Sequence, residues 1–171
     1  MNWVTLLVGG VLMAGVCSAG ELKFETAILK EGGPEATIQL AYKTDTVKQH
    51  PVILMLGSLD PKALPDWSTG LVDEGYMLAA FSVAYPPDPD PARRPQWLVF
   101  DERFAHGYVL GGSRAPTDTK RVIDYLISRG DVHPKKIGWM GSSSTGIPGL
   151  SVAVHEPRLA AIVATSAPAA T

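Results

Sequence analysis

One run of small and hydroxylated residues contains hydroxyl groups that can act as nucleophiles. The run reads Gly141-Ser142-Ser143-Ser144-Thr145-Gly146. The apolar segment 136–141 before it predicts a strand, and residues 146–155 after it predict a helix. A sharp turn from strand to helix can lift a serine hydroxyl clear of a sheet, while the helix N-terminus brings a backbone N–H close to developing negative charge. The run therefore predicts a nucleophilic serine for acyl transfer, and the alternative is that these residues only cap a helix.

Two serines compete for the role of nucleophile. Ser143 has Gly141 two residues before it but Thr145 two residues after it, whereas Ser144 has a glycine only on the later side, at Gly146. Each choice departs once from the pattern G-x-S-x-G, whose small residues let the strand and helix approach each other. We favour Ser143, because the first glycine of the pattern then ends the strand, and we expect the β-branched Thr145 to be a cost in a crowded place.

The segments that must position this run alternate between strand and helix patterns. Residues 22–28 and 37–42 alternate apolar and polar side chains around a Gly-Gly-Pro turn, and residues 51–56 form a continuous apolar run typical of a buried strand. We expect further elements as follows: a helix at 65–75 capped by Asp66, a strand at 76–84, a proline-rich surface excursion at 85–95, a short helix at 97–108, helices at 117–129 and 146–155, and strands at 136–141 and 159–165. This order predicts an α/β fold, a mostly parallel sheet with helices on both faces.

Residues 124–138 with the serine turn, and the run 157–163 after the following helix, resemble the α/β-hydrolase superfamily. The resemblance is to the branch that holds acetyl xylan esterases, dienelactone hydrolases and prolyl-oligopeptidase-like enzymes, and it spans about residues 51–167. It implies an α/β-hydrolase-type sheet that is truncated after about the sixth strand, in a partial α/β-hydrolase domain over residues 20–171.

The resemblance also implies roles for individual residues. Ser143 would attack an acyl carbon, and the backbone N–H of Ser144 would stabilise the oxyanion, with a second N–H from Ser58 or Leu59 in the loop after the strand at 51–56. Gly141, Thr145 and Gly146 would shape the elbow. Such a serine hydrolase acts on a small-molecule ester, or less commonly a peptide, and it needs no cofactor or metal.

A base and an acid must activate such a serine, and in this fold both follow the serine on later loops. Only six residues follow Thr165, and none is acidic or a histidine. We expect none of the four histidines, at positions 50, 106, 133 and 155, to serve as the base: His133 and His155 should lie a strand or helix length from Ser143, and the pattern does not place His106. We expect Asp60 to be a solvated loop residue. We therefore expect a fragment of a longer parent with little turnover of its own; the alternatives are a catalytically inactive hydrolase-fold protein or a peptidase of the prolyl-oligopeptidase-like type.

Composition and the N-terminus limit the partners and the compartment. The 15 basic and 17 acidic residues give a net charge of −2 without long blocks of one sign, which argues against nucleic acid as a partner. Residues 3–16 are almost wholly apolar and Cys17-Ser18-Ala19 are small, so residues 1–19 predict a signal peptide and a secreted or periplasmic protein. The apolar stretch is shorter than the ~20 residues of a stable membrane span. Cys17 is the single cysteine, so the mature chain would have no thiol, and no pattern fixes an oligomeric state.

Overall fold

The computed structural model describes residues 20–44, 47–62, 64–82 and 102–165, and within these ranges it leaves aside the side chains of 102–113, Ser144 and Ile147. The signal peptide predicted at 1–19 and the proline-rich excursion predicted at 85–95 lie outside the described residues. No helix within the described ranges is long and apolar enough to cross a membrane.

Six strands form one sheet in the described part of the chain. Their bounds are β1 Leu22–Leu29, β2 Ala36–Lys43, β3 His50–Leu56, β4 Met77–Phe81, β5 Val132–Ser142 and β6 Leu159–Thr165. The spatial order is β1-β2-β4-β3-β5-β6. The pairs β1–β2 and β2–β4 are antiparallel, and β4–β3, β3–β5 and β5–β6 are parallel. The predicted mostly parallel sheet of about six strands is confirmed.

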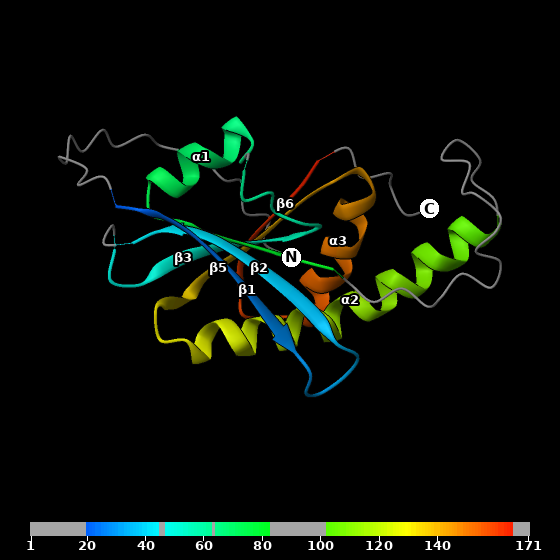
Figure 1. Cartoon of the computed structure of the whole chain (residues 1–171). Coiled ribbons are helices and arrows are strands. Elements are labelled where there is room, and N and C mark those ends of the chain that lie inside the picture. The colour runs from blue at the N-terminus through cyan, green and yellow to red at the C-terminus, as the bar shows by residue number, and fades with distance from the viewer. Residues whose placement is uncertain (1–19, 45–46, 63, 83–101, 166–171) are drawn as a thin grey trace.

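Helices cover both faces of this sheet, as predicted (Figure 1). Helix α1, Asp66–Asp73, lies on one face, where Val72 packs with Leu78 and Ala80 of β4. Helix α2, Glu102–Ser128, and helix α3, Gly146–His155, lie on the other face, where a larger core gathers around the fully buried Trp139 of β5. The central strand β4 is buried on both faces, so apolar helices must cover the sheet from both sides.

Two details of the helices differ from the prediction. The helix predicted at 117–129 begins at Glu102 and runs through Pro116, so it also takes in most of the short helix predicted at 97–108. Proline removes one backbone donor, and burial of Ala115, Val122 and Leu126 against the sheet holds the helix together around it. The N-cap of α1 is Pro65 and not Asp66, and the Pro65 carbonyl accepts a hydrogen bond from the Ser68 hydroxyl at 2.6 Å.

Candidate functional site

The serine turn lies at the carboxyl end of β5, where a 3₁₀ turn, η1, Ser143–Thr145, leads into α3. Strand β5 ends at Ser142, one residue later than predicted, with φ −130° and ψ 145°. The chain then reverses at Ser143, which has φ 51° and is the one non-glycine with positive φ in the described segments. A left-handed serine costs about 1–3 kcal/mol, and such strain concentrates at active sites. The Ser143 side chain is exposed.

Gly141 has its place because the chain returns onto it. A Cβ atom at Gly141 would lie 2.4 Å from the carbonyl oxygen of Thr145 and 3.0 Å from the backbone nitrogen of Gly146. The backbone of Thr145 and of Gly146 therefore lies directly against Gly141, which brings the three predicted elbow residues together. Gly149 allows a similar approach one turn further along, since a Cβ there would lie 2.2 Å from Nε1 of Trp139. These contacts place α3 directly against β5.

Thr145 does not cause the steric crowding that we expected from its β-branched side chain. Its side chain is half-buried, and its hydroxyl oxygen accepts a hydrogen bond from the Ser142 N–H and donates one to the Ser142 carbonyl, both at 2.9 Å. The Gly146 N–H donates to the Ser143 carbonyl. Thr145 fits because its hydroxyl group lies across the turn, against the backbone of Ser142, and not between strand and helix.

The loop after β3 comes to the same edge of the sheet. Leu54 of β3 pairs with Trp139 of the parallel β5, so both strands run on to this edge side by side. In the loop, Leu59 donates its N–H to Oε1 of Gln39 at 2.8 Å, which leaves Ser58, an exposed residue, as the better candidate of the two predicted oxyanion donors. Gln39 lies on β2, and no local sequence signal identified it as a support for this loop.

The three histidines with described side chains do not approach Ser143. His133 is the second residue of β5, nine residues before Ser142, which is roughly 30 Å in a strand. His155 ends α3 and donates from Nδ1 to the Ser151 carbonyl at 2.8 Å. His50 is buried at the start of β3 and donates from Nδ1 to the Gly75 carbonyl at 2.9 Å. The separation from Ser143 that was predicted for His133 and His155 agrees with this placement, whereas the side chain of His106 is not described.

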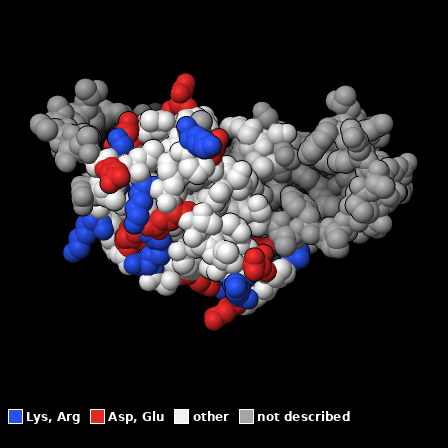
Figure 2. Space-filling view, in the orientation of Figure 1, with Lys and Arg blue, Asp and Glu red and all other residues white. Residues whose placement is uncertain are grey.

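Asp60 is exposed and accepts the Lys62 N–H at 2.8 Å within its own loop, in keeping with a solvated residue. Among the described residues no three His, Cys, Asp or Glu side chains gather as metal ligands. Basic and acidic side chains are mixed over the face in Figure 2, without a broad patch of one sign.

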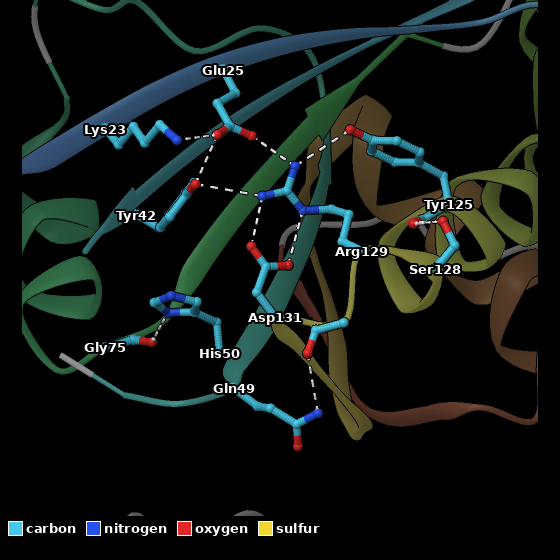
Figure 3. A network of polar contacts seen from close by, with 11 residues as sticks. Lys23, Glu25, Tyr42, Gln49, His50, Gly75, Tyr125, Ser128, Arg129 and Asp131 are labelled. Atoms are coloured by element: carbon cyan, nitrogen blue, oxygen red, sulfur yellow. Dashed lines mark hydrogen bonds and ion pairs between the residues drawn. The ribbon is translucent and has the colours of Figure 1, made fainter. Parts of the chain in front are cut away.

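Among the described residues, a polar cluster gathers around Arg129, between the end of α2 and the start of β5 (Figure 3). Arg129 binds Glu25 of β1 and Asp131, each at 2.7 Å, and Tyr42 of β2 donates its hydroxyl to Glu25 at 2.8 Å. Burial acts to raise the pKa of Glu25, but hydrogen bonds from Lys23, Tyr42 and Arg129 outweigh it and lower the pKa to about 2. This cluster fastens the antiparallel hairpin to the end of α2 and the start of β5.

Comparison with solved structures identifies the fold. A protein from Klebsiella pneumoniae named as a dienelactone hydrolase superposes with a TM-score of 0.67 at 15% identity, covering 88% of this chain and 62% of that one. A cold-adapted esterase from an Arctic intertidal metagenomic library gives 0.60 at 17% identity, covering 84% and 58%. A structure from a study of two prolyl endopeptidases gives 0.59 at 14% identity, covering 84% and 21%.

The chain therefore has the α/β-hydrolase fold, as its resemblance implied, and it spans less than two thirds of the length of these three structures. No protein-family model matches the sequence. No curated protein sequence is similar to it.

Proposed function

We propose that the chain carries the nucleophile of a serine hydrolase that cleaves carboxylic esters, with Ser143 as that nucleophile. The observation that supports this most is the left-handed conformation of Ser143, φ 51°, at a strand-to-helix turn that only a glycine at position 141 permits. Backbone strain at an exposed serine persists only where the surrounding structure maintains it. Presenting the hydroxyl to an acyl carbon is a function that such strain serves.

The reaction has two steps. The Ser143 oxygen bonds to the acyl carbon, the bond to the alcohol breaks, and the serine proton leaves with the alcohol; water then cleaves the acyl-serine ester. The N–H groups of Ser144 and Ser58 are the donors that we assign to the oxyanion. The fold neighbours support an ester substrate, since one is an esterase and another is named as a dienelactone hydrolase. A peptide substrate is the variant that the prolyl endopeptidase structure suggests.

Ester hydrolysis tests this proposal when it is measured on the full-length protein, by which we mean the chain together with any segment that follows Thr171. We expect p-nitrophenyl acetate and butyrate to be cleaved, with kcat falling by at least about 10³-fold in Ser143→Ala, because the nucleophile is lost. Ser144→Ala is the matched control in the same turn, and it should keep kcat within about threefold. Equal activity of Ser143→Ala and the wild type would overturn the assignment.

A hydrolase-fold protein without catalysis is the second candidate, and one observation favours it: the three described histidines lie away from Ser143. A full-length protein that binds short-chain esters but releases no alcohol would support this second candidate. The two candidates are thus separated by product release, measured on the same protein.

We further propose that residues 1–19 direct export and that the mature chain begins at Gly20. The apolar stretch 3–16 and the small residues 17–19 support this proposal. N-terminal sequencing of the protein from a secreting host should find Gly20 as the first residue. An uncleaved Met1 on cell-retained protein would contradict it.

A further inference from the structure

The conformation of Ser143 needs a cause beyond its own sequence. A serine gains nothing intrinsic from φ 51°, so neighbouring groups must hold the chain there. The glycine at 141 only permits the turn, because it removes a clash with the Thr145 carbonyl and adds no attraction. The Gly146 N–H fixes the carbonyl of Ser143 from the helix side. A group on the strand side is still required.

We propose that the hydroxyl of Thr145 is that group, a positioning residue that holds Ser143 in its left-handed conformation. The inference rests on the proposed function for its purpose, but its geometry stands on the hydrogen bonds alone. Oγ1 accepts from the Ser142 N–H and donates to the Ser142 carbonyl, both at 2.9 Å, so it satisfies both backbone groups of the residue before the nucleophile. A single side-chain oxygen thus holds the N–H and the carbonyl of Ser142, which belong to the peptide units on either side of that residue.

The side chain at this position explains a departure from the pattern G-x-S-x-G. A glycine at 145 would meet the requirement for a small residue but would leave the Ser142 N–H and carbonyl to water. Valine would keep the shape of threonine and lose the hydroxyl, and serine would keep the hydroxyl and lose the methyl group. Three substitutions therefore separate shape from hydrogen bonding.

The first readout requires no activity. Amide hydrogen exchange at Ser142, measured by NMR on the full-length protein, should quicken about tenfold in Thr145→Val and Thr145→Gly, because the N–H loses its acceptor. The HN–Hα coupling and Cα shift of Ser143 should move toward an average over several conformations in both variants. Thr145→Ser should resemble the wild type in each measurement.

The second readout connects the hydroxyl to the nucleophile. With a fluorophosphonate probe, the maximum labelling rate should fall about tenfold in Thr145→Val and Thr145→Gly, while the probe concentration at half-maximal rate stays unchanged. Thr145→Ser should restore the rate to within about threefold.

The two measurements separate the role of the Thr145 hydroxyl from the proposed hydrolase function. If Thr145→Gly labels as fast as the wild type and keeps slow exchange at Ser142, steric fit and not the hydroxyl sets the turn, and the inference is wrong. If exchange at Ser142 and the conformation of Ser143 respond as expected but the wild type never labels, the inference holds and the proposed hydrolase function fails. If Thr145→Val does not fold, the pair Thr145→Gly and Thr145→Ser still gives the comparison.

Discussion

Gly141 lies where the backbone of Thr145 returns to the strand, and its environment predicts a sharp response to one methyl group. A Cβ atom there would lie 2.4 Å from a carbonyl oxygen, which is backbone and cannot move without opening the turn. We expect Gly141→Ala to lower the free energy of unfolding by about 2–3 kcal/mol, measured by urea denaturation.

Gly70 is the matched control for this substitution. It lies in α1, it is exposed, and a Cβ there would meet nothing within 4 Å. Gly70→Ala should therefore raise stability by about 0.5–1 kcal/mol, because alanine is the better helix former. Equal effects of the two substitutions would show that the turn does not close as described.

The sequence predicted a serine turn between β5 and α3 but not the contacts that hold its residues. Gly141 and the two serine registers were visible in the pattern G-x-S-x-G, whereas the φ of Ser143 and the hydrogen bonds of Thr145 arise only when strand and helix are packed together. The role of Gln39 against Leu59 could not be predicted, since β2 and the loop meet through tertiary structure.

The spacing of apolar residues predicted most strands and helices, because most of these elements have a distinct apolar face or apolar run. The limits of α3 and β6 were predicted to the residue, at 146–155 and 159–165. The long α2 was divided in two by the prediction, because local propensity treats a proline as a boundary while burial of the residues around Pro116 overrides it. The register of β3 against β5 likewise depends on packing.

Glu25 gives the hairpin β1–β2 a dependence on pH. Its pKa in the folded chain, about 2, lies below the ordinary value of 4.5, so its contribution to stability is fully present above about pH 4.5 and is lost as pH falls toward 2. Because the side chain is partly exposed, we expect a contribution on the order of 1 kcal/mol.

Glu25→Gln tests this assignment through unfolding measured between pH 2 and pH 7. The variant should be less stable than the wild type at pH 7, and the difference should shrink as the pH falls below 4.5. Glu35→Gln is the control, since Glu35 is exposed in the turn between the same two strands. A constant difference between Glu25→Gln and the wild type over the whole range would contradict the role of the carboxylate.

The amino and carboxyl ends of the parallel strands form two edges of the sheet that carry different groups. The edge at the amino ends of β3 and β5 carries the Arg129 cluster, and the histidines His50 and His133 lie there. The edge at the carboxyl ends carries the serine turn and the loop with Ser58, so strained and exposed groups gather away from the ion pairs. Ligands of open α/β sheets bind at the carboxyl edge, which agrees with this division.

Peptide mapping of a fluorophosphonate adduct tests whether Ser143 is the nucleophile. The serine oxygen displaces fluoride from phosphorus, so the adduct marks the attacking residue by mass. The full-length protein, labelled and digested, should carry one adduct, on Ser143, that is absent from Ser143→Ala and retained in Ser144→Ala. An adduct on Ser144, or an unmodified 141–146 peptide in a protein that hydrolyses esters, would contradict the claim.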